Sequence, residues 1–197
     1  MHESSAAELL FESFCAANGV RCNRVKAGAT PTPDYRLSVG DHAVYVEVKQ
    51  IDVDPDFRAT NGVSSRQVGE HVRRKIADAR GQMQVAAASG HAAILLIYNN
   101  LDPLQLFGTE QHDFLCAMYG ELTISLRAGN AAGSYYGRNS TLRSGHNASF
   151  SAVGHLYRRR EGLAVRLYEN FFAKFPLEYG RLPDCIETIR ISLDNAA

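Results

Sequence analysis

Apolar residues near the start of the chain recur at helical spacing. Ser4 or Ser5 suits the N-cap of a helix, and Asn18-Gly19 is typical of a helix end. We therefore expect a first helix that runs to about Asn18 and carries Glu8. Its apolar stripe is predicted to consist of Leu9, Leu10, Phe14 and Ala17.

Strict alternation of apolar and polar residues follows, and it predicts a β-hairpin. Two β-rich runs, Tyr35 to Val39 and Ala43 to Lys49, are joined by Gly40-Asp41-His42. Because side chains alternate along a strand, one face of the second run holds valines and the other holds polar residues. The valines (Val44, Val46, Val48) are expected to face the core, and Tyr45, Glu47 and Lys49 are expected to face the other way.

Longer apolar patterns complete the first half of the chain. A long helix is predicted from Ser64 or Ser65 to about Ala88. Its apolar stripe is Val68, Val72, Ile76, Ala79, Met83 and Ala87. The run AAILLIY at 92–98 is apolar without alternation, which is typical of a central strand covered on both faces.

The second half reads as a short helix and several strands. We predict a helix at about 110–118, a strand at 121–127 and a long loop at 128–147. Strands are expected near 150–157 and 163–168, with a last one near 187–193. The fold class is therefore α/β in a single domain over 1–197, with a core at about 4–127 and a C-terminal β extension at about 148–197.

Composition changes this interpretation little. Hydrophobic residues make up 45% and charged residues 21% of the chain, as in ordinary globular domains. No apolar run approaches the roughly 20 residues that span a bilayer, and the first residues lack the pattern of a signal peptide. We expect a cytoplasmic protein with no membrane partner. The four scattered cysteines fit reduced thiols better than disulfides or a zinc site.

Charge is balanced overall but uneven locally. Lys plus Arg and Asp plus Glu both total 21, so net charge gives no sign of a polyanionic partner. The segment Leu122 to Arg160, in contrast, has six arginines and no acidic residue. Any nucleic-acid surface is therefore expected to be local.

Three residues of the predicted hairpin carry the candidate chemistry. Asp34 stands at the start of one strand, and Glu47 and Lys49 project from one face of the other. Phosphodiester hydrolysis needs a cation near the phosphoryl oxygens and an oriented water. Asp34, Glu47 and the backbone carbonyl of Val48 would supply oxygen ligands for Mg²⁺, and Lys49 would stabilise the transition state. The plain alternative is a solvated strand face with alternating charges.

The pattern resembles the PD-(D/E)XK nuclease superfamily, with Pro33-Asp34 as the first half-motif and Glu47-Val48-Lys49 as the second. The resemblance covers about 8–98, and the remainder is similar to the tails of bacterial stand-alone members. It implies a restriction endonuclease-like fold, a central mixed β-sheet flanked by helices with extra C-terminal strands here. It also implies that Glu8 contributes to the metal site, and that Mg²⁺ is the cofactor, with Mn²⁺ as a substitute.

Other residues are candidates for supporting roles. Resemblance to the superfamily implies that Lys75 and Gln82 on the long helix point into the site, although an ordinary solvated helix face explains them as well. Basic and aromatic residues that could contact phosphate or bases are Arg74, Tyr135, Arg138, Arg143 and Arg159. The plain alternative is a solvated helix face for Arg74 and a hairpin tip for Arg159. For Tyr135, Arg138 and Arg143 it is a mobile surface loop.

The sequence thus predicts a Mg²⁺-dependent endonuclease acting on DNA, with 5′-phosphate products implied by the resemblance. A catalytically silent nucleic-acid-binding or interaction module with the same fold is the first alternative, and an RNA-cleaving nuclease is the second. Concerted cutting of both strands needs two active sites, which would suit a homodimer. No residue in the sequence identifies an interface between copies.

Overall fold

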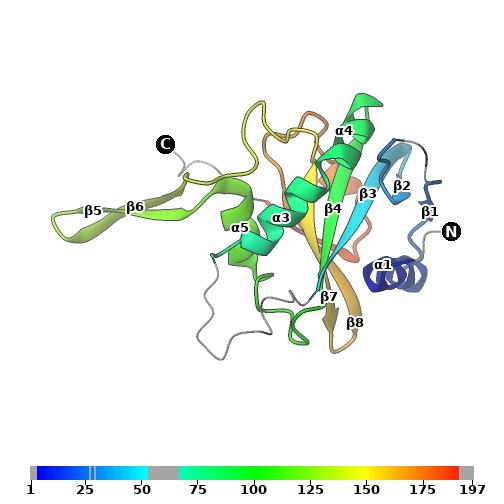
Figure 1. Ribbon diagram of the computed structural model, residues 1–197, viewed down its shortest axis with the longest axis horizontal. Coiled ribbons are helices and arrows are strands. Elements are labelled where there is room, and N and C mark those ends of the chain that lie inside the picture. Colours follow the sequence, from blue (N-terminus) through cyan, green and yellow to red (C-terminus); the bar gives the residue numbers. More distant parts are fainter. Residues whose placement is uncertain (1–3, 27, 29, 53–66, 191–197) are drawn as a thin grey trace.

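A mixed β-sheet forms the centre of the computed structural model, which describes residues 4–26, 28, 30–52 and 67–190 (Figure 1). Its seven strands lie in the order β1-β2-β3-β4-β7-β8-β9. They are β1 Cys22–Arg24, β2 Tyr35–Val39, β3 His42–Ile51, β4 Ala92–Asn99, β7 Ala152–Arg159, β8 Gly162–Glu169 and β9 Ile186–Ile189. The β1-β2-β3 and β7-β8 pairs are antiparallel, and the β3-β4-β7 and β8-β9 pairs are parallel. The predicted α/β class with a mixed sheet is confirmed.

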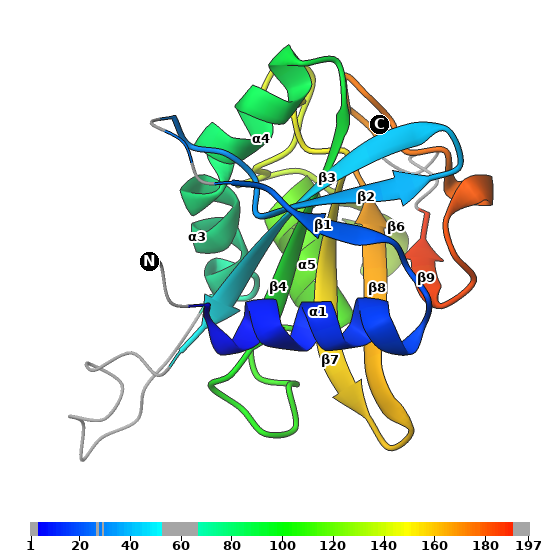
Figure 2. The same ribbon diagram turned by 90° about the vertical axis from the view of Figure 1, so that its right-hand side faces the viewer.

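Helices cover both faces of this sheet (Figure 2). Helix α1 (Ala6–Ala17) packs on one face against the valines of β3, as the alternation predicted. Helices α3 (Glu70–Asp78), α4 (Arg80–Ala88) and α5 (Gln111–Tyr119) pack on the other. Strand β4 lies at the middle of the sheet and is buried on both faces, in agreement with its unbroken apolar run. None of the described helices is long and apolar enough to cross a membrane.

Helix α1 begins and ends as predicted but buries a partly different stripe. Ser5 and Glu8 form a capping box at its start, and Asn18 follows its last turn. Its buried apolar residues are Ala7, Phe11, Phe14 and Cys15, whereas Leu9 is 52% exposed. The prediction is confirmed for Phe14 and, in part, for Leu10, which packs against this core while partly buried. It was wrong for Leu9, because Phe11 packs on the sheet instead, edge-on against Tyr35 at 5.1 Å between ring centroids.

The predicted long helix is two helices. Its proposed start at Ser64 or Ser65 lies outside the described residues, and the helical run breaks at Ala79, between α3 and α4. Gly81, a poor helix former, lies beside the break. The apolar stripe is nevertheless confirmed from Val72 to Ala87, because the break keeps the buried positions on one side. Its predicted first member, Val68, precedes α3 and is 41% exposed, so that part of the prediction was wrong.

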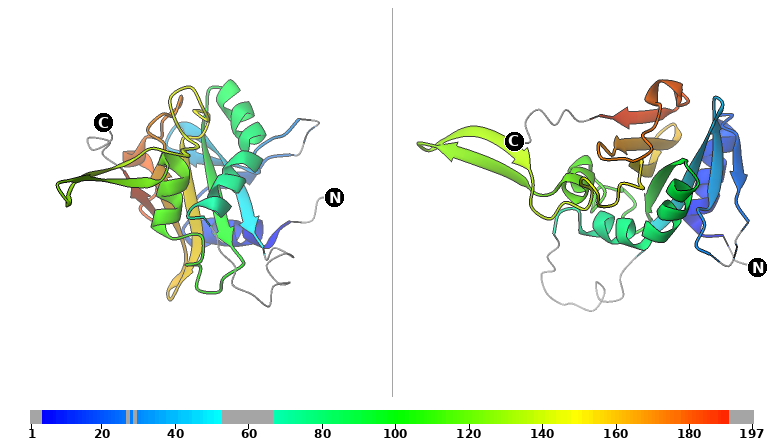
Figure 3. Two further views of the ribbon diagram at one scale, coloured as in Figure 1. Left: turned by 60° about the vertical axis from the view of Figure 1, so that its left-hand side comes forward. Right: turned by 90° about the horizontal axis from the view of Figure 1, so that it is seen from above.

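Part of the predicted loop at 128–147 is a strand. Strand β5 (Leu122–Arg127) pairs with β6 (Asn130–Tyr136) in a separate two-stranded sheet that projects from the body (Figures 1 and 3). We call residues 122–136 the arm. Ala128 and Gly129 connect its strands with φ values of 50° and 81°, the left-handed backbone that tight hairpins need. Ala-Gly is a weak turn signal, which is why the loop prediction was wrong.

The C-terminal strands join the main sheet. The hairpin of β7 and β8 is confirmed, with Arg160 and Glu161 between its strands. The last predicted strand is confirmed at Ile186–Ile189, and its predicted end at Leu193 lies outside the described residues.

Candidate active site

The β2-β3 hairpin sets Asp34 beside Glu47. Tyr35 pairs with Val46, so the next residues outward, Asp34 and Glu47, are cross-strand neighbours on one face. Oδ2 of Asp34 accepts a hydrogen bond from the backbone N–H of Val48 at 2.9 Å. This bond fixes the first carboxylate at the middle of the Glu47-Val48-Lys49 motif.

Glu47 is buried and only partly satisfied. Its side chain faces the layer of α3, α4 and α5, and the residue is 1% exposed. Nζ of Lys49 lies 2.6 Å from Oε1, but Oε2 is buried without a hydrogen-bond partner. A buried carboxylate oxygen without a partner is costly. The motif is therefore not the solvated strand face that we considered as its alternative.

Burial and like charge shift both carboxyl groups. Burial, reinforced by the neighbouring Asp34 and opposed by Lys49, raises the pKa of Glu47 to about 7. Burial also raises the pKa of Asp34, as does the charge of Glu8, whereas the Val48 N–H, Lys49 and Arg24 lower it. Two acids that resist ionisation side by side have the electrostatic character of a cation site.

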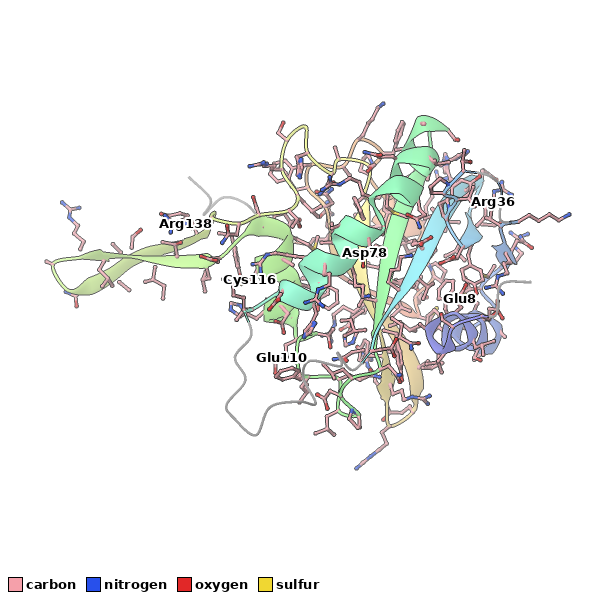
Figure 4. All side chains as sticks on the ribbon, viewed as in Figure 1. Glu8, Arg36, Asp78, Glu110, Cys116 and Arg138 are labelled. Carbon is pink, nitrogen blue, oxygen red and sulfur yellow. The ribbon has the colours of Figure 1, made fainter. Side chains whose placement is uncertain are left out.

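Glu8 lies on α1, the helix on the opposite face (Figure 4), and its charge acts on the pKa of Asp34. The residue is 8% exposed, and its Oε2 accepts from the Ser5 N–H at 2.6 Å. Its Oε1 accepts from Arg24 at 2.5 Å. Burial raises the pKa of Glu8, but the Ser5 and Arg24 contacts outweigh burial, so the net shift is downward.

Arg24 is the residue of this site that the sequence did not reveal. It lies on β1, a strand of three residues with no alternation to mark it. Its guanidinium pairs with Glu8, lies 3.9 Å from Oε1 of Glu12, and lowers the pKa of Asp34. A backbone hydrogen bond also links the end of β1 to the start of β2, because the Val25 N–H donates to the carbonyl of Asp34 at 2.8 Å.

Gln50 fixes the start of α1 against β3. Its Oε1 accepts from the backbone N–H of Ala7 at 2.9 Å, which satisfies one of the free amides at the helix start. Its Nε2 donates to Asp52 at 2.6 Å. Since Ala7 precedes Glu8 and Gln50 follows Lys49, this bond holds the α1 carboxylate close to the motif strand.

The two accessory candidates lie on separate helices. Lys75 is on α3 and forms an ion pair at 3.7 Å with Asp78, which is labelled in Figure 4. Gln82 is half-buried on α4, beyond the break at Ala79. Within the described ranges, no hydrogen bond or ion pair joins either side chain to Asp34, Glu47 or Lys49.

The nucleic-acid-binding candidates are spread over several elements. Arg74 is exposed on α3 beside Glu70, at 3.3 Å. Tyr135 is on strand β6 of the arm, not in a loop as predicted, whereas Arg138 lies in a turn at the base of the arm, within the predicted loop (Figure 4). Arg143 is exposed in the segment after the arm, and Arg159, near the β7-β8 tip, pairs with Glu187 at 2.7 Å. These residues come from several separate elements and do not form one continuous patch. The carboxylate of Glu187 offsets the charge of Arg159.

The donor set suits a hard cation bound through few protein ligands. Among the described residues, no group of three or more His, Cys, Asp and Glu side chains is arranged to hold a metal ion. Mg²⁺ usually keeps several waters and binds through one or two carboxylates together with substrate phosphate. Asp34 and Glu47, with its unpartnered Oε2, fit that mode.

Comparisons with protein-family models, with curated proteins and with solved structures gave no match to this chain. The functional assignment therefore depends on the residues and their geometry.

Proposed function

We propose that this protein is a metal-dependent nuclease of the PD-(D/E)XK type, which hydrolyses phosphodiester bonds in DNA with Mg²⁺. The observation that carries the proposal is the cross-strand pair of Asp34 and Glu47 with Lys49 at 2.6 Å from Glu47. The order of α1, the β1-β2-β3 meander, α3 and α4, and the parallel β4 supports a restriction endonuclease-like core.

Each side chain has a distinct role in this proposal. When bound, Mg²⁺ would supply a Lewis acid that offsets charge on the phosphoryl oxygens. Asp34 and Glu47 would bind the cation, with the Val48 carbonyl as a third oxygen and Glu8 acting through water. Lys49, which contacts Glu47 in the structure, would donate to the attacking water and to the phosphoryl oxygen.

Cleavage of supercoiled plasmid DNA tests the proposal directly. We expect conversion to nicked or linear product with Mg²⁺ or Mn²⁺, and none with EDTA. Competition between DNA and RNA duplexes of the same sequence would separate DNA from RNA cleavage. A protein that neither cuts DNA nor binds Mg²⁺ or Mn²⁺ by titration calorimetry with DNA present would instead be the silent binding module.

Substituting Arg24→Ala is expected to lower the Mg²⁺ concentration for half-maximal cleavage by about fivefold. The guanidinium offsets the negative charge of Glu8, so its removal leaves a more negative site for the cation. Stability should change by no more than about 1 kcal/mol, because the Arg24 side chain is 43% exposed. Metal titration of the cleavage rate is the measurement.

Arg21→Ala is the matched control, because Arg21 is exposed and lies just before β1. It should leave the half-maximal Mg²⁺ concentration unchanged. An unchanged or higher requirement in the Arg24 variant would remove Glu8 and Arg24 from the metal site.

A further inference from the structure

The arm carries an aliphatic face that the rest of the described chain does not cover. Leu122, Ile124 and Leu126 are 43%, 58% and 70% exposed, so their exposure rises from the base of the arm toward its tip. All three lie on β5, in the part of the molecule that extends furthest from the main sheet (Figures 1 and 3).

Strand alternation puts these side chains together. Residues two apart on β5 share a face, and Leu122 and Ile124 pair with Tyr136 and Ser134 across the hairpin. Leu126 pairs with Ala131, beyond a register shift that leaves one residue of β6 unpaired. The opposite face of β5 holds Thr123, Ser125 and Arg127. Tyr135, which is 38% exposed, pairs with Thr123 and lies on this opposite face. The arm thus has one face with three aliphatic side chains and one that is mostly polar, which is the pattern of a sheet packed against a partner.

The base of the arm holds it in a defined direction. The Glu121 N–H donates to the carbonyl of Arg138 at 2.7 Å, and the Gly137 N–H donates to the carbonyl of Glu121 at 3.3 Å. Gly120, with φ of 101°, lies so close to the returning chain that an added Cβ would come 2.5 Å from the carbonyl oxygen of Gly137. The aliphatic face is therefore presented outward by a fixed support.

An isolated two-stranded sheet is marginally stable in water, and it needs a covered apolar face to persist. The aliphatic face exposes on the order of a few hundred Å², the size of the largest apolar patch on a typical monomer, which is often functional. In the described chain, β5 and β6 pair only with each other, so both outer edges also have backbone groups available for pairing.

The charges of the arm indicate which partner fits. Residues 122–136 contain one charged side chain, Arg127, and no acidic one. Binding to a polyanion depends on several cations, so the arm itself is poorly suited to a nucleic acid. A second copy of the chain, in contrast, brings an identical aliphatic face and identical free edges, which is the self-complementarity that a two-fold interface requires.

We propose that the aliphatic face of the arm binds the same face of a second copy of this chain about a two-fold axis. The proposal is independent of the nuclease assignment, since its measurement is molecular mass. Sedimentation equilibrium of the full chain, at concentrations from about 1 to 100 µM, should give a mass near twice 21.7 kDa at the upper end.

Ile124→Asp should raise the dimer dissociation constant at least about tenfold, because it places a charge in the middle of the aliphatic face. Leu126→Asp, at the 70% exposed position, should act in the same direction and leave the body untouched. Thr123→Asp is the matched control, since it adds the same charge to the opposite face of the same strand. Its dissociation constant should stay within about threefold of the unsubstituted chain.

Circular dichroism melting verifies that each variant is folded. A monomer at every concentration would overturn the proposal, and so would equal weakening by the Thr123 and Ile124 variants. A monomer whose arm binds duplex DNA, with loss of binding in Ile124→Asp, would assign the face to nucleic acid and overturn the proposal as well.

Discussion

Substituting Lys49→Ala is expected to reduce Mg²⁺-dependent DNA cleavage by about a thousandfold. The Nζ of Lys49 is the only cation that the described chain places in an ion pair with Glu47, at 2.6 Å. Removing it takes away the donor proposed for the attacking water. It also takes away a charge that lowers the pKa of Glu47, so this carboxyl group would hold its proton to higher pH.

The second effect is separable from the first by pH. A deficit caused by protonated Glu47 should shrink as pH rises, so a rate that stays low as pH is raised reports the loss of the Lys49 ammonium itself. Lys174→Ala, which removes a lysine from the segment after β8, should cleave as fast as the unsubstituted chain. Equal cleavage by the Lys49 variant would remove the site proposed here.

The motif hairpin was predictable because its signals are local. The valines of β3 alternate without interruption, and Gly40-Asp41 supplies the turn, so the register that sets Asp34 opposite Glu47 follows from the sequence. The burial of Glu47 was not predictable in this way. Alternation assigns it to the face opposite the valines, but only the packing of α3, α4 and α5 removes that face from water.

Three other features were not predicted, because they also depend on contacts between segments that are far apart in the sequence. Arg24 belongs to a strand of three residues, β1, which is formed by its antiparallel pairing with β2. The second strand of the arm, β6, consists largely of small residues with low β propensity, and cross-strand pairing with β5 overrides that preference. The stripe of α1 was misplaced at Leu9, because Leu9 fits helical spacing as well as Phe11 does.

The unpartnered oxygen of Glu47 connects the fold to the proposed chemistry. The fold buries a carboxylate whose Oε2 has no hydrogen-bond partner, and a bound cation would relieve this cost in the proposed function. The folded chain is therefore less stable with an ionised Glu47 at the position where the proposed function needs a metal ligand. Replacing Glu47 by a neutral residue should change the free energy of unfolding measurably.

Glu47→Gln is expected to make the metal-free chain more stable at pH 8, by about 3 kcal/mol. The pKa of Glu47 is raised to about 7 in the folded state, so its contribution to stability is fully present below the unfolded value of 4.5. That contribution is lost as pH rises through 7, and glutamine avoids the loss. Urea unfolding in EDTA should show the difference shrinking to about 1 kcal/mol at pH 5.5.

The pH dependence that His155 adds to stability does not affect this comparison. Burial, with the nearby Arg166, lowers the pKa of His155 to about 4, so its contribution is present above 6.5 and is lost as pH falls. Both chains contain His155, and its effect therefore cancels in their difference. Added Mg²⁺ should stabilise the unsubstituted chain and leave Glu47→Gln unchanged. Equal unfolding free energies at pH 8, with equal responses to Mg²⁺, would show that Glu47 is neither strained nor a ligand.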